Sequence, residues 1–312
     1  MKKIIAIIGP TGVGKTEASI LLAQTLSTEI ISSDSMQIYK HMNIGTAKPS
    51  ADQMAIVKHH MIDIVEPWVS YSTGRYIEDV VPVINAIHIN TQLPVITGGT
   101  GLYLKAMTRG LFRGPAADWD LREELMQKEH SLPGALYEEL MKLDKNTAAA
   151  IEPADTKKIV RALEICIKSS CPASDLRAAE TVPLPFEFIK IGLTRQRQEL
   201  YKIIDARVDK MISNGLVNEV SNVNSIIESA RPSEPLSSFS SMQAIGYKEV
   251  IEHLTGQASL DEAQNLIKQR SRNYAKRQYT WFRKEEGIKW IDITGIFSSE
   301  DICSSINQQL NI

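Results

Sequence analysis

Cysteine is scarce in this chain, with three in 312 residues: Cys166, Cys171 and Cys303. Three cysteines cannot build a disulfide framework in a chain of this length, and no C-x-x-C pair is present to start a zinc site. Long apolar runs are missing as well. The apolar run at residues 4–8 stops at Gly9-Pro10, far short of the roughly 20 residues of a membrane span, and no small-residue cleavage site follows it. We therefore expect a cytoplasmic protein without a membrane partner.

A large excess of one charge is also missing. The chain has 35 Lys and Arg against 37 Asp and Glu, a net charge of −2, which by itself argues against nucleic acid as a partner. Residues 268–289, however, hold eight basic and two acidic residues, so this window carries +6 and the rest of the chain −8. Such a window is typical of a face that meets a polyanion. A solvated helix face with extended Lys and Arg side chains explains the charge equally well.

The 43 % hydrophobic content is ample for a large core. Short apolar runs alternate with segments of helical periodicity, and this alternation predicts an α/β fold with a parallel sheet. The expected strands are residues 3–8, 29–33, 93–97 and 186–193. Residues 17–26 are the expected covering helix, and residues 195–228 and 260–284 are expected to be helical, separated by a Ser- and Pro-rich loop at 229–241.

Between the third and fourth strands, residues 118–169 show helical periodicity throughout. We interpret them as a helical insertion that is entered through Arg113-Gly114-Pro115 and left through a loop at residues 171–185. The predicted organisation is a core domain of residues 1–113 and 186–312, which carries the basic C-terminal helices, and an all-helical domain of residues 114–185.

One motif points directly to phosphate chemistry. It fits the phosphate-binding loop (P-loop) pattern G-x-x-x-x-G-K-[ST] and lies between a buried strand and a helix, where such a loop must lie. Its residues are Gly9, Pro10, Thr11, Gly12, Val13, Gly14, Lys15 and Thr16. The backbone N–H groups and the helix N-terminus attract phosphate oxygens, Lys15 adds a full positive charge, and the Thr16 hydroxyl can ligate Mg²⁺. A di- or triphosphate is therefore expected here.

P-loop enzymes that hydrolyse or transfer a phosphoryl group usually carry an acidic residue at the end of a later strand. Here the strand at 93–97 runs into Gly98-Gly99-Thr100-Gly101, without Asp or Glu. The chain instead has an acidic residue, Asp34, at the C-terminal end of the second strand, on the edge where α/β proteins bind ligands. Asp34 opposite a phosphate cradle suggests proton abstraction from an acceptor. A turn aspartate that binds nearby amides is the alternative.

Several segments together resemble the bacterial tRNA dimethylallyltransferase family, the tRNA isopentenyltransferases. They match in order along nearly the whole chain: GPTGVGKT (9–16), SSDSMQIYK (32–40), NIGTAKP (43–49), HHMIDIVEP (59–67), VITGGTGLYLKA (95–106), RALE (161–164), LYKIIDARVDKMISNGLVNEV (200–220), QAIGYKE (243–249) and YAKRQYTWFR (274–283). The resemblance implies a P-loop NTPase-like parallel sheet flanked by helices, with an inserted helical domain. It also implies transfer of a dimethylallyl group from dimethylallyl diphosphate to N6 of the adenosine 3′ of the tRNA anticodon, with Mg²⁺ and release of diphosphate.

The same resemblance assigns roles to residues. Lys15, Thr16 and Arg207 would stabilise the departing diphosphate, Asp34 would accept the N6 proton, and Thr100 would lie near the reacting groups. Contacts to tRNA would come from two sets of residues. The first set lies at the site or in the insertion: Asp34, Ser35, Met36, Gln37, Thr100, Arg122, Lys158, Ile159, Val160, Arg161 and Ala162. The second lies on the basic C-terminal helix: Arg272, Lys276 and Arg283, with Tyr279 at the same helical spacing.

Other interpretations remain open at this point. A small-molecule P-loop kinase or an adenylate isopentenyltransferase would use the same cradle, but neither needs the basic helix or the insertion. A non-catalytic RNA-binding protein has no use for Lys15, Thr16 and Asp34 together. The chain departs from the family pattern at Asn43, Arg75-Tyr76, Lys157-Lys158 and Ser271, all outside the P-loop. Adjacent histidines on a strand point to opposite faces, so we interpret His59-His60 as structural, and we expect a monomer.

Overall fold

The computed structural model describes residues 1–112 and 114–311. Arg113, at the predicted entry to the insertion, lies outside the described residues. The chain forms two compact units, one of Met1–Lys105 together with the chain from Pro185 onward, and one of Ala106–Leu184. Each unit is described by itself below.

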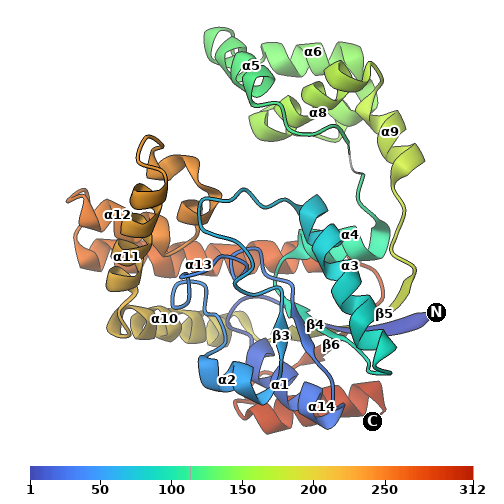
Figure 1. Cartoon of the computed structure of the whole chain (residues 1–312), viewed down its shortest axis with the longest axis vertical. Helices are drawn as coiled ribbons and strands as arrows, with labels where there is room; N and C mark the ends of the chain where they lie inside the picture. Colours follow the sequence, from blue (N-terminus) through green and yellow to red (C-terminus); the bar gives the residue numbers. More distant parts are fainter. Residues whose placement is uncertain (113, 312) are drawn as a thin grey trace. The chain divides into compact units, whose positions relative to one another are not determined.

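The first unit is built on a parallel sheet, drawn in Figure 1. Within the described residues it has six strands in the order β3-β2-β4-β1-β5-β6. They are β1 (Lys2–Ile8), β2 (Ile30–Ser32), β3 (His59–His60), β4 (Val95–Gly98), β5 (Phe186–Thr194) and β6 (Ile288–Asp292). All pairings are parallel. The first strand in sequence therefore lies inside the sheet, between β4 and β5.

Successive side chains of β1 point to opposite faces of the sheet, and because they are apolar on both faces, helices cover both. On one face, Ile5 and Ile7 belong to a buried cluster with residues of α1 (Lys15–Thr25), α10 (Arg197–Ser213) and α14 (Ser299–Leu310). On the other face, Ala6 and Ile8 pack with Leu104 of α4 (Gly101–Arg109) and Phe282 of α13 (Leu260–Phe282). This burial on two sides explains why the strand is apolar without alternation.

A second core of the first unit holds the loop after β2 against the C-terminal helices. Ile38, Tyr39 and Met42 from the loop are buried with side chains of α10, α11 (Leu216–Ala230), α12 (Tyr247–Leu254) and α13. The remaining helices of this unit are α2 (Ala51–Ile56) and α3 (Thr73–Ile89). The start of α13 is fixed by a capping box between Ser259 and Glu262.

The second unit is helical. It contains α5 (Trp119–Ser131), α6 (Ala135–Leu143), α7 (Lys145–Ala149), α8 (Thr156–Ser169) and α9 (Ala173–Glu180). Its core is formed by apolar residues of α5, α6 and α8, the 3.6-residue periodicity of which was the basis of the sequence prediction. Its two ends lie close together, since the Leu184 N–H donates to Met107 O at 3.1 Å.

The structure corrects three expectations about secondary structure. The predicted exit loop at residues 171–185 contains the helix α9. The predicted helical stretch 195–228 is two helices, α10 and α11, which separate at Asn214-Gly215, where Gly215 has a left-handed φ of 97°. The loop predicted at 229–241 begins within α11, holds a short 3₁₀ turn at Leu236–Ser238, and overlaps a second one at Ser240–Gln243. The helices α2, α3, α4, α12 and α14 and the strand β6 were not predicted.

Candidate active site

The carboxyl ends of β1, β2 and β4 meet at one edge of the sheet. Backbone pairing sets Ser32 beside Thr97, the Ser33 N–H donates to Thr97 O at 2.7 Å, and the Thr100 N–H donates to Ser33 O at 3.1 Å. Open parallel sheets bind ligands at this edge. The P-loop after β1, the segment carrying Asp34 after β2 and the glycine loop after β4 are thus brought together.

The P-loop has the geometry of an anion cradle. Gly12 and Gly14 have left-handed φ values of 78° and 107°, which other residues adopt only with strain. Because Gly14 has no side chain, the first turn of α1 has no side-chain cap, and its N–H groups remain available to an anion. The Lys15 ammonium donates to Gly9 O at 3.0 Å and to Pro10 O at 2.8 Å. The Lys15 side chain thus lies across the P-loop.

Charges from three segments converge on this cradle. Burial lowers the pKa of Lys15 to about 8, against the raising effect of the Asp34 carboxylate, and Arg207 on α10 lowers it further. Burial likewise lowers the pKa of Arg207, while the charges of Asp34 and Glu17 raise it. Asp205, on the same helix as Arg207, binds Arg272 at 2.5 Å. Lys15, Asp34 and Arg207 therefore form one electrostatic group.

One oxygen of the Asp34 carboxylate is held in a turn. Its Oδ1 accepts the Met36 N–H at 2.9 Å, which is the turn that was considered as an alternative role. Among the described residues no hydrogen bond is made to Oδ2, so this oxygen is free to accept a proton. Thr100 supports the same turn, since its Oγ1 accepts the Ser35 N–H at 3.0 Å. Ser35 and Met36 thus shape the Asp34 turn through their backbones.

Three tyrosines that the sequence did not single out as site residues surround Asp34. The rings of Tyr76 and Tyr103 stack at a centroid distance of 3.8 Å, and the Tyr76 hydroxyl donates to Ser32 O at 3.0 Å. Burial raises the pKa of Tyr76, Tyr103 and Tyr274, and the Asp34 charge raises it further. The phenols therefore stay neutral. Tyr76 and Tyr103 are buried, and Tyr274 is partly exposed, so of these three rings only that of Tyr274 can present a flat surface to a ligand.

Gln37 is placed in the loop after β2, and its amide is engaged inside the chain. Its Oε1 accepts the Ser32 hydroxyl at 2.9 Å, and its Nε2 donates to Ala47 O at 3.2 Å. The resemblance implied that Gln37 contacts tRNA. In this structure it holds the loop at residues 37–47 to the end of β2.

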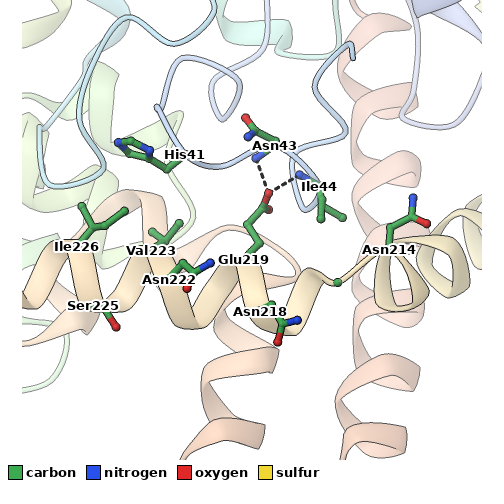
Figure 2. A pocket seen from close by; sticks show the side chains of 11 residues that line it. His41, Asn43, Ile44, Asn214, Asn218, Glu219, Asn222, Val223, Ser225 and Ile226 are labelled. Atoms are coloured by element: carbon green, nitrogen blue, oxygen red, sulfur yellow. Dashed lines mark hydrogen bonds between the residues drawn. The ribbon is translucent and has the colours of Figure 1, made fainter. Parts of the chain in front are cut away.

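The same loop is anchored by Glu219 of α11, as Figure 2 shows. The Glu219 carboxylate accepts the N–H groups of Asn43, Ile44 and Gly45 at 2.7–3.0 Å, and the Tyr247 hydroxyl at 2.6 Å. Beside it lies a pocket of about 690 Å³ lined by polar side chains of α11 and the loop, including Asn43. The residue at position 43 thus contributes its backbone to this anchor.

The basic window divides into two parts. Lys268, Arg270 and Arg272 form ion pairs with acids on neighbouring helices, namely Asp209, Glu249 and Asp205. Lys276 and Arg283, the other two predicted tRNA contacts of this helix, are exposed. The Tyr279 hydroxyl is occupied by Thr194 and the Arg195 N–H. The positive surface is therefore concentrated toward the C-terminal end of α13.

In the second unit, the predicted contacts separate in a similar way. Ile159, Val160 and Ala162 are buried in its core, so their side chains are not on its surface. Lys158 is exposed beside Asp155, with which it pairs. Arg122 and Arg161 both pair with Glu164.

No cluster of three or more His, Cys, Asp or Glu side chains that could hold a metal ion occurs in residues 1–112 and 114–311. The ring nitrogens of His59 and His60 bind Val57 O and the Glu29 carboxylate, which fits their structural interpretation. No helix in the described part of the chain is long and apolar enough to cross a membrane.

A parallel sheet with a phosphate-binding loop after its first strand, and helices on both faces, places the chain among proteins of the P-loop NTPase-like fold. This confirms the predicted fold class. Residues 37–285 match the family model described as IPP transferase, and the chain belongs to this family.

Relatives extend the match to the whole chain. A tRNA dimethylallyltransferase of Thermodesulfovibrio yellowstonii is 54 % identical over 310 residues, covering 99 % of this chain and 98 % of the relative. The solved tRNA isopentenylpyrophosphate transferase of Bacillus halodurans is 39 % identical with a TM-score of 0.70, covering 100 % and 97 % of the two chains. A eukaryotic dimethylallyltransferase solved acting on tRNA is 28 % identical with a TM-score of 0.82, covering 100 % and 80 %. The resemblance drawn from the sequence motifs is confirmed.

Proposed function

We propose that this protein transfers the dimethylallyl group of dimethylallyl diphosphate to N6 of the adenosine immediately 3′ of the anticodon in tRNA. One observation carries the proposal. A P-loop with Lys15 and Arg207 beside it faces the carboxylate of Asp34 across a single sheet edge. The binding site for a diphosphate leaving group thus lies next to a proton acceptor. The relatives described above are named for this activity.

In this proposal the P-loop holds the diphosphate of the donor. The allylic C–O bond breaks, and its electron pair leaves with the diphosphate, on which negative charge develops. Lys15, Arg207 and the N–H groups at the start of α1 are positive groups in a partly buried site, so they stabilise this charge. Lys15 must exchange its contacts with Gly9 O and Pro10 O for diphosphate oxygens when the donor binds.

The other half of the reaction belongs to Asp34. The adenine N6 forms the new bond to the allyl carbon and gives up one proton, which Asp34 Oδ2 accepts. A neutral exocyclic amine is a poor nucleophile, so a positioned base and close placement of the two reactants supply much of the rate. Tyr274, which is partly exposed beside Asp34, offers a flat surface for the base, which must leave its stack to reach the site.

We also propose that Mg²⁺ binds with the donor. The Thr16 hydroxyl, at the start of α1, makes no hydrogen bond within the described residues, so it is available as a ligand. Mg²⁺ commonly takes one or two protein oxygens and completes its shell with substrate phosphates and water, which agrees with the lack of an acidic cluster. When bound, Mg²⁺ would neutralise part of the charge on the leaving diphosphate.

For tRNA, we propose that the anticodon stem-loop meets exposed cations. Lys276 and Arg283 at the C-terminal end of α13 fit phosphate contacts of the stem. Lys158 and the half-exposed guanidinium of Arg161 are the corresponding groups of the second unit. We propose that the protein acts as a monomer in the cytoplasm, where tRNA is modified.

The test follows a label from the donor. The protein is incubated with Mg²⁺, labelled dimethylallyl diphosphate and either unmodified tRNA or AMP. The expected result is label in tRNA, absent with Asp34→Ala and reduced without Mg²⁺. Label only in AMP would assign the chain to adenylate isopentenyltransferases. Phosphoryl transfer from ATP, with none from the allyl donor, would assign it to kinases.

A further inference from the structure

Gln278 of α13 joins two loops of the site through its side-chain amide. Its Oε1 accepts the Thr11 N–H of the P-loop at 2.8 Å, and its Nε2 donates to Gly99 O in the glycine loop after β4 at 2.9 Å. The residue is 5 % exposed. A buried amide that satisfies a donor on one loop and an acceptor on another fixes both loops, because losing it leaves both backbone groups without their partner.

The backbone is built to let this side chain approach. A Cβ at Gly99 would lie 2.2 Å from Gln278 Nε2, and a Cβ at Gly101 would lie 2.1 Å from the Trp281 ring. One face of α13 therefore rests directly on the backbone of the glycine loop. Tyr274, one turn before Gln278, lies on this face beside Asp34.

The connection continues from the glycine loop to the acid. Thr100, the neighbour of Gly99, receives the Ser35 N–H on its hydroxyl and donates its own N–H to Ser33 O. These two contacts flank Asp34. A short series of bonds thus runs from the P-loop through Gln278 to the turn that carries the carboxylate.

We propose that Gln278 is a positioning residue that sets the separation between the diphosphate cradle and Asp34. It touches neither the donor nor the adenine in this assignment, and it acts by holding the two loops that do. The inference rests on the proposed function. It also implies that the Thr11 N–H belongs to the architecture of the loop, as does the Val13 N–H, which donates to Pro10 O at 3.4 Å, while the N–H groups at the start of α1 remain for phosphate.

The test uses substitutions that alter one hydrogen bond at a time. Gln278→Met removes both bonds at similar volume. Gln278→Glu keeps an acceptor for the Thr11 N–H, but it can donate to Gly99 O only when the carboxyl group is protonated. Gln308→Glu makes the same change at an exposed position of α14 and serves as the control.

The expected results separate positioning from general stability. Gln278→Met should lower kcat about ten- to a hundredfold at all pH values, with a smaller effect on donor binding. For Gln278→Glu, the ratio of its kcat to that of the wild type should rise as the pH falls from 8.5 to 6, because burial raises the pKa of the new carboxyl. A purely structural role would leave this ratio constant across the pH range.

The following outcomes would overturn the role. A Met variant with kcat within twofold of wild type would do so, and so would a Glu variant with a ratio that does not change with pH. Should the Met variant fail to fold, Gln278→Asn takes its place, because it keeps both polar groups on a side chain too short to bridge the two loops. A kcat of Gln278→Asn within twofold of wild type would then overturn the role. If the wild type itself transfers no dimethylallyl group to tRNA, the proposed function fails and this role with it.

Discussion

Arg122 and Glu164 form a bidentate ion pair in the second unit. Arg122 Nε lies 3.0 Å from Glu164 Oε1, and Arg122 Nη2 lies 2.8 Å from Oε2. Arg161 binds the same carboxylate, which also accepts the Asp118 N–H at the start of α5. Two arginines assigned to tRNA by resemblance thus share one fully buried acid, and their guanidinium groups are fixed before any RNA binds.

This arrangement predicts that Glu164 is a stability determinant of the second unit. Burial alone would raise the pKa of Glu164, but the bonds from Arg122, Asp118 and Arg161 lower it overall. Glu164→Gln leaves two cations without a counter-charge and should cost about 3 kcal/mol of unfolding free energy. Urea unfolding measures the loss, with Glu124→Gln, exposed on α5, as the control. Equal midpoints for the two variants would contradict the assignment.

The same pKa shift has a pH signature. Because the folded-state pKa of Glu164 lies below that of the unfolded chain, its contribution to stability is complete above the unfolded value. It is lost as the pH falls through the folded-state pKa. The stability difference between wild type and Glu164→Gln, measured at pH 7 and in acid, should therefore shrink in acid. A difference that grows in acid would reverse the sign of the argument.

Asp34→Asn should separate chemistry from binding. The amide cannot accept the N6 proton, so kcat for transfer should fall by roughly 10²- to 10⁴-fold. Binding of dimethylallyl diphosphate should not weaken, since the substitution removes a negative charge near the anion. Single-turnover transfer and equilibrium binding of the donor measure the two effects, with Asp52→Asn on the exposed start of α2 as the matched change. Parallel losses of rate and binding would assign Asp34 to the donor instead.

The lowered pKa of Lys15 predicts a pH limit on donor binding. With a pKa of about 8 in the free protein, set mainly by burial, the ammonium loses its charge above that pH. Donor affinity should therefore be constant below pH 8 and fall by up to about tenfold per pH unit above it. Lys15→Arg remains charged throughout and should bind more weakly but without this dependence. An identical slope in the Arg variant would show that another group titrates.

Gly98 should tolerate no side chain. A Cβ there would lie 2.1 Å from Ser33 O, which is backbone and cannot turn aside. Gly98→Ala should therefore displace the turn that carries Asp34 and lower kcat more than donor binding. Gly256→Ala, in a turn with no atom within 4 Å of the added Cβ but with φ of 75°, should cost about 1 kcal/mol of stability and leave kcat alone. An active Gly98→Ala enzyme would contradict the close packing.

The exposed end of α13 predicts the salt dependence of tRNA binding. Lys276→Gln should weaken binding to all tRNA substrates and reduce the slope of log affinity against log salt by about 1, the value for one phosphate contact. Lys3→Gln, at the opposite end of β1 from the site, removes the same charge and serves as the comparison. Equal slopes for the two variants would place the stem elsewhere.

The features that could be predicted from the sequence are those set by residues close together in the chain. The P-loop is a contiguous motif, and β1 is recognisable because it is apolar on both faces. The helices of the insertion follow from periodicity. Asp34 was found because it follows a buried strand. In each case the physical cause, whether a backbone angle, a period or a strand end, acts over a few residues.

Contacts between distant segments were not predictable in this way. Gln278 is one polar residue in a long polar helix, and only the structure brings it to Thr11, 267 positions away. Glu164 carries no local sign of serving two arginines. The helix α9 was missed because its short sequence, ASDLRAAE, has little apolar periodicity. The full charge of residues 268–289 was assigned to the surface, whereas three of the five basic residues in its helical part pair with acids from other helices.

The position of β1 between β4 and β5 has a consequence for synthesis on the ribosome. The strand made first gains its second neighbour only after the whole helical unit has emerged, because β5 follows that unit in the chain. The backbone amides of Asn43–Gly45 gain their hydrogen-bond acceptor even later, because Glu219 lies about 175 residues downstream. Chains truncated before β5 should therefore display β1 as an unpaired sheet edge and remain clients of chaperones, even though their P-loop is complete.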